Sequence, residues 1–170
     1  MTLSALILAT ALAAQDSEWR PPTPLDWLHG SWSCRVSGAG ATALLHRERW
    51  QPDDWSGTHV LVDEVRGGVR VGAQPLANGR ILGRGDDFVL THRMRGASSP
   101  TPAIYHSVRV GERAVEFVTD EAVSPQRIVY RRTATALVVT HSRRDGGAAR
   151  TWRMLSEDDS AGDRACDGGR

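Results

Sequence analysis

Histidine is the side chain that most often carries proton chemistry near neutral pH, and six histidines are spread along this chain of 170 residues. His92, His106 and His141 lie on stretches in which alternate residues are apolar, over 88–94, 104–108 and 137–141. A neutral imidazole that points into an interior can hydrogen-bond a ligand, or ligate a metal or a haem iron. The alternative is a core histidine bonded to a neighbour, or one at the rim of a strand.

Aromatic residues supply the second group of candidates. Trp50 and Trp55 flank the sequence Gln-Pro-Asp-Asp and can lie at an opening, where indole rings can stack on a flat ligand. Core packing is the competing interpretation. Together with two aromatic residues on predicted strands, the candidate ligand-binding residues are Trp50, Trp55, His92, His106, Tyr130, His141 and Trp152.

Motifs of known enzyme classes are missing from the sequence. It contains no G-x-S-x-G, H-E-x-x-H, C-x-x-C or phosphate-binding loop, so we assign no catalytic residue and no metal site. The two cysteines, Cys34 and Cys166, do not have the spacing of a zinc site. In an oxidising compartment they can pair, and otherwise they are a small buried residue and a free thiol.

The elements that must position these side chains are short strands. Runs of period-two alternation are separated by glycine, proline, aspartate or asparagine, and no long helical pattern follows residue 12. Parallel strands need long crossovers, so the sheet should be antiparallel, forming a sandwich or a barrel. A short helical turn before the first strand favours the barrel, because such a segment can close one end. We predict an all-β, antiparallel up-and-down β-barrel of about ten strands over residues 25–156.

The segments on either side of the predicted barrel indicate the cellular compartment of the protein. Residues 1–14 resemble a short signal peptide, although a misassigned start or a buried apolar segment would give the same pattern. Residues 15–24 form a proline-rich linker, and 157–170 a polar tail predicted to be disordered. With 21 basic and 20 acidic residues, nothing indicates nucleic acid as a partner, and no later stretch is long enough to cross a membrane. A secreted or periplasmic location is expected.

Three blocks of the sequence resemble a known family. They are LDWLHGSW (25–32), WQPDDWSGTHVLVDEVRGGV (50–69) and FVTDEAVSPQRIVYRR (117–132). Together they are similar to the lipocalin-like bacterial domain-of-unknown-function family numbered 6265. The resemblance implies a calycin-like β-barrel, comparable to lipocalins and fatty-acid-binding proteins. Within the first block, it implies a structural role for Trp27, Gly30 and Trp32.

The third block departs from the family pattern. The matching residues are Glu121, Pro125, Gln126 and Arg127, whereas Ala122 and Val123 replace a histidine and an aspartate. Since that polar pair is absent, the remaining motif is expected to be structural. Proline suits a strand entrance because it has no N–H to lose, and Arg127 is expected to pair with Glu121 across the turn.

Three functions follow from these observations. The first is non-catalytic binding of a small apolar molecule in the barrel lumen, without a cofactor. The second is a haem-binding barrel of the nitrobindin type, which needs an inward histidine with open space before it. The third, ranked lowest, is an enzyme with a site near Pro125, Gln126 and Arg127.

Overall fold

The computed structural model describes residues 25–53, 57–84, 87–96, 101–157 and 165–166. The expected signal peptide (1–14), the linker (15–24) and Trp55 lie outside the described residues, as does most of the tail. Within the described residues the fold is all-β, as the sequence predicts, and the only helices are two 3-10 turns, η1 (Asp26–Leu28) and η2 (Gly40–Thr42).

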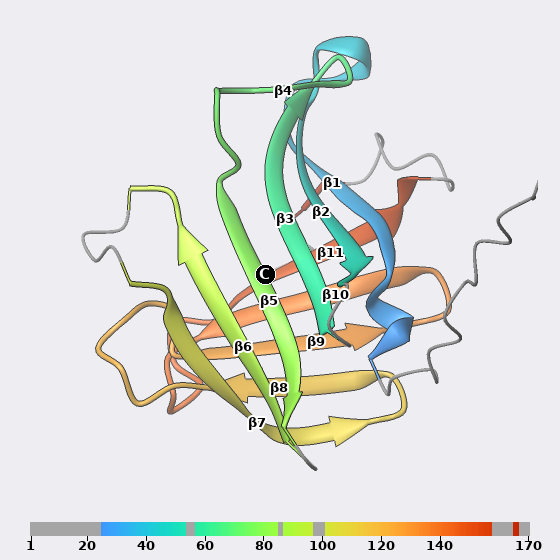
Figure 1. Cartoon of the computed structure of the whole chain (residues 1–170). Coiled ribbons are helices and arrows are strands. Elements are labelled where there is room, and N and C mark those ends of the chain that lie inside the picture. Colours follow the sequence, from blue (N-terminus) through green and yellow to red (C-terminus); the bar gives the residue numbers. More distant parts are fainter. Residues whose placement is uncertain (1–24, 54–56, 85–86, 97–100, 158–164, 167–170) are drawn as a thin grey trace, which may run out of the picture.

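Eleven strands in the described residues form one antiparallel sheet (Figure 1). Their bounds are β1 (Gly30–Ser37), β2 (Leu44–Pro52), β3 (Gly57–Arg66), β4 (Val69–Arg70), β5 (Ala77–Arg84), β6 (Asp87–Met94), β7 (Ala103–Gly111), β8 (Ala114–Val118), β9 (Arg127–Arg132), β10 (Ala136–Ser142) and β11 (Arg150–Ser156).

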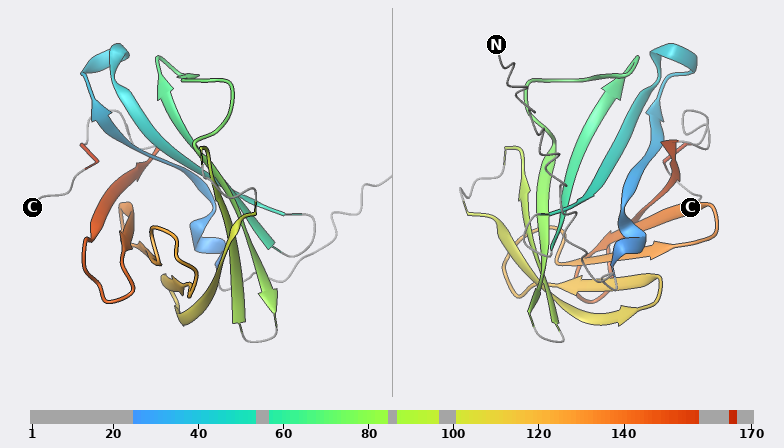
Figure 2. Two further views of the ribbon diagram at one scale, coloured as in Figure 1. Left: turned by 90° about the vertical axis from the view of Figure 1, so that its left-hand side faces the viewer. Right: turned by 45° about the vertical axis from the view of Figure 1, so that its right-hand side comes forward.

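The sheet closes on itself into a barrel. From β5 to β11 each strand pairs with the next, β11 pairs with β1, β1 with β2, β2 with β3, and β3 with β5. The two-residue β4 pairs only with β3, beyond one end of the barrel (Figure 2). Ten strands therefore form a closed antiparallel up-and-down barrel, which confirms the predicted fold class. Closure removes the unpaired edges that an open sheet would expose.

Period-two alternation decides which side chains fill the interior. Along β10, Leu137 and Val139 are buried on the lumen side, and along β6 Leu90 is buried between Phe88 and His92. Trp50, Tyr105, Phe117 and other fully buried side chains complete a core that fills part of the barrel. Burial of this apolar surface is the main force that holds the strands in register.

The turn η1 closes one end of the barrel, as expected of the N-terminal helical segment. Trp32 Nε1 donates a hydrogen bond to the Leu28 carbonyl oxygen at 2.9 Å, and Arg132 Nη1 donates to that of Trp27 at 2.8 Å. The Arg132 guanidinium lies 5.0 Å from the centroid of the Trp32 ring. Gly30 follows with φ of +127°, a conformation that side chains rarely adopt. These contacts hold η1 against the strands at this end of the barrel.

The seam between β1 and β11 is short. The two strands pair only at Trp32 with Ser156 and at Ser33 with Leu155. Further along, Cys166 takes the place of the missing pairing, because its N–H donates to the Arg35 oxygen at 2.9 Å and its oxygen accepts from the Arg153 N–H at 3.2 Å.

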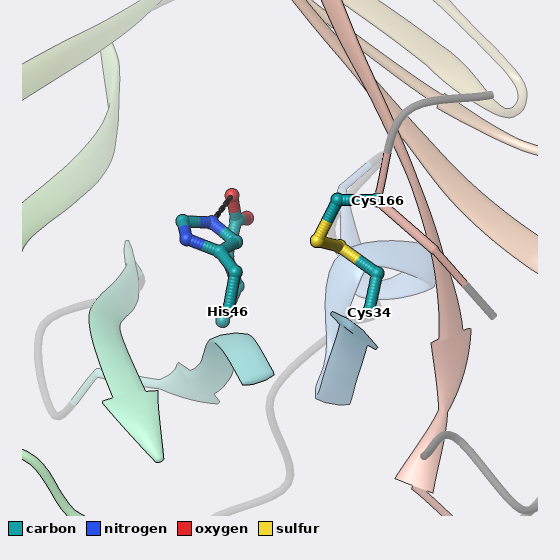
Figure 3. The surroundings of a disulfide bond; sticks show 4 residues. Cys34, His46 and Cys166 are labelled. Atoms are coloured by element: carbon teal, nitrogen blue, oxygen red, sulfur yellow. Dashed lines mark ion pairs between the residues drawn. A yellow bond between two sulfur atoms is a disulfide. The ribbon is translucent and has the colours of Figure 1, made fainter. Parts of the chain in front are cut away.

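A disulfide between Cys34 and Cys166 fixes this segment, which confirms that the cysteines pair (Figure 3). The predicted disordered tail therefore needs correction at residues 165–166, which bridge to β1. Disulfides are typical of chains that fold in an oxidising, extracytoplasmic compartment.

Candidate functional site

The lumen keeps a cavity of ≈ 210 Å³ at the end opposite η1. Its wall combines apolar side chains with a group of ionisable ones. The lining residues are His46, Glu48, Val62, Leu76, Ala77, His92, Met94, Tyr130, His141, Arg150 and Trp152. Small-molecule sites have this composition, a mostly apolar wall with a few convergent polar groups.

Five strands deliver the ionisable side chains, and the fifth, β11, contributes Arg150. His46 and Glu48 come from β2, His92 from β6, Tyr130 from β9 and His141 from β10. His92 lies directly opposite Gly79 of β5 in the register, and the absence of a side chain at Gly79 leaves room for the imidazole. Residues far apart in the sequence therefore converge because the barrel closes.

Glu48 is the acidic residue among those that line this cavity, and it is 4% exposed. Its Oε2 accepts a hydrogen bond from Trp50 Nε1 at 3.0 Å. Its Oε1 lies 3.7 Å from His46 Nε2, a contact that becomes an ion pair when the imidazole is protonated (dashed line in Figure 3). The negative charge of the lumen is thus concentrated at one residue.

The two histidines across the cavity are held neutral. Burial lowers the pKa of His141 to about 4; the Glu48 charge opposes this, while His92, His46 and Arg150 reinforce it. Burial also lowers the pKa of His92, again against the effect of Glu48. A neutral imidazole offers one donor and one acceptor nitrogen. At neutral pH both rings can therefore accept a hydrogen bond from a ligand.

Tyrosine hydroxyls add donors that do not ionise. Burial is the main cause, and the Glu48 charge the next, that raises the pKa of Tyr130 well above its ordinary value. Burial, and after it the charge of Glu121, raises the pKa of Tyr105 to about 12. Tyr105 donates to the Pro125 oxygen at 2.7 Å. The side chains of Tyr130, His92 and His141 all line the cavity, where a ligand can reach them.

Trp152 forms the aromatic wall of the cavity. Its ring centroid lies 4.7 Å from that of His141 in an edge contact and 6.1 Å from that of His46 in a stacked one. The Arg150 guanidinium sits 4.9 Å from the ring centroid, on an exposed residue. Arg150 therefore marks the solvent side of the cavity.

Two of the sequence-predicted candidates lie elsewhere. His106 points to the exposed outer face of β7, because its neighbours Tyr105 and Ser107 occupy the inner face. Trp50 is not at an opening but 1% exposed in the core, where its ring contacts Tyr130 edge-on at 5.0 Å. Trp50 therefore packs in the core, which is the alternative that the sequence also allowed, and His106 lies outside the lumen, whereas Tyr130, His92, His141 and Trp152 line the cavity.

Sequence reasoning did not assign His46, Glu48 and Arg150 to the site. The signal that could have found the first two is the alternation of His46, Glu48 and Trp50 along β2. The intervening residues Arg47 and Arg49 obscured it, because with charges on both faces the strand does not reveal which face is interior.

The third block is placed beside a second cavity of ≈ 440 Å³, lined in part by Glu121, Ala122, Val123 and Ser124. The prediction that Arg127 pairs with Glu121 is wrong. Arg127 pairs with Glu116 across the β8–β9 pair, with its Nε 2.8 Å from Oε1 of Glu116. That hydrogen bond holds the pKa of Glu116 below its ordinary value. Glu121 Oε1 instead accepts from the Ile104 N–H at 3.0 Å, and Gln126 Nε2 lies 3.5 Å from the Glu121 oxygen.

His92 and Met94 line both cavities and so lie between them. Among the described residues, no group of three or more histidine, cysteine or acidic side chains has an arrangement that could hold a metal ion. No helix in the described part of the chain is long and apolar enough to span a bilayer.

Comparison with protein-family models, with curated proteins and with solved structures gives no match to this chain. The closed barrel is consistent with a calycin-like fold. Membership of the family numbered 6265 rests on the three sequence blocks and stays a prediction.

Proposed function

We propose that this chain is a non-catalytic binding protein that holds one compact small molecule in its lumen, in an extracytoplasmic compartment. The observation that carries the proposal is the lumen cavity, where the polar side chains of His92, His141 and Tyr130 meet an apolar wall. A mostly apolar wall with a few convergent polar groups is the composition typical of small-molecule sites.

The size of the cavity restricts the ligand. At ≈ 210 Å³ it falls below the roughly 300–1,000 Å³ of clefts that hold drug-sized molecules. It exceeds the roughly 150 Å³ apolar cavity that binds benzene in an engineered protein. A molecule of about one ring with a short substituent fits within this volume, whereas a whole haem or a long-chain lipid exceeds it. The cavity volume therefore favours a compact ligand over the haem alternative.

The enzyme alternative near Pro125, Gln126 and Arg127 gains no support from the geometry. Arg127 is engaged with Glu116, and the Pro125 oxygen accepts from Tyr105. We therefore do not propose a reaction at the third block.

A cavity-filling substitution tests the proposal. Ala77 is 3% exposed and lines the cavity, so Ala77→Leu should fill it without unfolding the barrel. Titration calorimetry with one-ring probes (benzyl alcohol, benzylamine and benzoate) should show binding to the parent chain and at least a tenfold loss in this variant. Ala134→Leu, at an exposed turn position, is the control and should bind as the parent does. Binding of none of the probes to the parent, or equal binding to Ala77→Leu, contradicts lumen binding.

A further inference from the structure

Two carboxylates are buried on the neighbouring strands β2 and β3, and the sheet directs them to opposite faces. Glu48 lies opposite Val62 on the lumen side, whereas Asp63 lies opposite Arg47 on the outer side. Their exposed fractions are 4% and 1%. Each carries the desolvation penalty of a buried charge, which proteins ordinarily offset with an opposite charge.

The carboxylate of Asp63 lies within ion-pair distance of three arginines. Arg49 Nη2 lies 3.0 Å and Arg47 Nη2 3.5 Å from its Oδ2, and Arg70 Nε lies 3.8 Å from its Oδ1. On the outer face of this strand pair, the protein itself therefore supplies the cations that offset the buried carboxylate of Asp63.

Glu48 has no such partner. Within the described residues no arginine lies within ion-pair distance of its carboxylate, and its contacts are the neutral Trp50 N–H and the His46 ring at 3.7 Å. The carboxylate faces the cavity without a permanent cation. A ligand that brings one would supply the opposite charge that Asp63 receives from its arginines.

The other groups around the cavity suit the same ligand. The neutral imidazoles of His92 and His141 each keep an acceptor nitrogen, and the Tyr130 oxygen can accept as well. Arg150 is exposed and lies over Trp152, so its charge is at the solvent side and is screened there. It disfavours a second positive charge at the outer end of the ligand.

We propose that the lumen binds a compact organic monocation, a protonated amine on an apolar body of about one ring, with Glu48 as its counterion. This inference rests on the proposed function, that the lumen binds a compact ligand. An ammonium group has three donors and no acceptor, which matches a carboxylate flanked by imidazole and phenol acceptors. The ring would pack against Trp152, and the aromatic face adds attraction for a cation.

Three probes of nearly equal size separate charge from shape: benzylamine, benzyl alcohol and benzoate, titrated at pH 7.5 by calorimetry. We expect benzylamine, which is protonated at this pH, to bind at least about tenfold more tightly than benzyl alcohol, and benzoate to bind most weakly. This comparison uses the unaltered chain and does not depend on a variant that folds.

The matched variants are Glu48→Gln and Glu112→Gln. Glutamine at position 48 keeps an acceptor for Trp50 Nε1 but removes the charge, so the preference for benzylamine over benzyl alcohol should disappear. Glu112 lies in the exposed β7–β8 turn, and its substitution removes the same unit of charge without changing the preference for the amine.

The outcomes distinguish this inference from the proposed function. If benzyl alcohol binds as tightly as benzylamine, or if Glu48→Gln keeps the preference for the amine, Glu48 is not a counterion, although lumen binding stands. If none of the three probes binds, the proposed function itself is wrong.

Discussion

At the scale of single residues, the lumen of this barrel places ionisable groups where ionisation is unfavourable. His92 and His141 are both surrounded by apolar strands, and the nearest acid, Glu48, only partly offsets the effect of burial on their pKa. Such environments are found at functional sites, and they also make the folded state sensitive to pH.

The pH dependence has a defined direction. His141 has an ordinary pKa of 6.5, which the unfolded chain retains, and a pKa of about 4 in the folded chain. Between these values the unfolded state binds more protons, so stability is fully present above pH 6.5 and falls as the pH drops toward 4. NMR titration of the His141 ring should give a midpoint near 4, and His141→Asn should flatten the loss of stability in this range. A midpoint near 6.5 would show that the ring is solvated.

Arg127 gives a second prediction at this scale. Its side chain is 32% exposed and that of Glu116 is 16% exposed, so solvent screens the pair. Arg127→Ala should lower the free energy of unfolding by less than about 1 kcal/mol and leave probe affinity unchanged. Arg131→Ala, at an exposed position on the same strand, is the control for urea unfolding. A variant that folds as the parent does but no longer binds would place Arg127 in the site.

Particular residues show where sequence reasoning succeeds and fails. His92 and His141 were expected to face inward because their alternate neighbours are apolar, and both line the lumen. The same argument failed for His106, since the outer face of β7 also carries apolar residues, Ile104 and Val108. The partner of Arg127 was sought nearby in the sequence, but the register of β8 with β9 brings Glu116 to it. Register between strands is not encoded in one strand's pattern.

At the scale of elements, the β5–β6 pair shapes the lumen through a glycine. A Cβ added at Gly79 would lie 3.0 Å from the Thr91 oxygen, 3.0 Å from Val60 Cγ1 and 3.3 Å from His92 Cδ2. Since two of these neighbours belong to the backbone and the core, neither can easily withdraw. The strand therefore excludes a side chain at this position, and the imidazole of His92 occupies the space.

We expect Gly79→Ala to destabilise the barrel by about 1–3 kcal/mol through overpacking, and to shift the NMR signals of His92. Gly83 in the same strand is the matched control, because its added Cβ would meet only Phe88 Cε1, at 3.8 Å. Gly83→Ala should leave the free energy of unfolding within about 0.5 kcal/mol of the parent in urea unfolding. Equal effects of the two substitutions would contradict the steric argument.

The elements themselves were largely predictable. Short alternating runs separated by turn residues indicated the antiparallel strands, and the Trp27–Trp32 region indicated a segment that closes one end. What the pattern did not reveal is the extent of side-chain filling, because the volume left in a lumen depends on how all facing strands pack together. The cavity beside Glu48 is a property of that packing.

At the scale of the whole molecule, barrel closure depends on residues distant in sequence. The β1–β11 seam has two paired positions, and the bond between Cys34 and Cys166, separated by 132 residues, secures the segment that extends it. A cross-link over so long a loop restricts the unfolded chain strongly.

Replacing Cys166 by serine should therefore lower the free energy of unfolding by about 2–5 kcal/mol. Hydrogen exchange at the Arg153 amide, which donates to the Cys166 oxygen, should accelerate more than exchange at amides of the β5–β6 pair. The Cys34→Ser variant should show the same loss in the free energy of unfolding and the same faster exchange at Arg153. Unchanged exchange at Arg153 would mean that the seam holds without the bond.

The same bond has a consequence for the integrity of the chain. It joins residue 34 to residue 166, so every turn between β2 and β11 lies inside a covalent ring. A protease that cuts one such turn leaves two fragments that stay linked, and the nicked protein should run as a single band until a reductant separates it. In an extracellular setting rich in proteases, one cleavage in a turn would not release either half of the barrel.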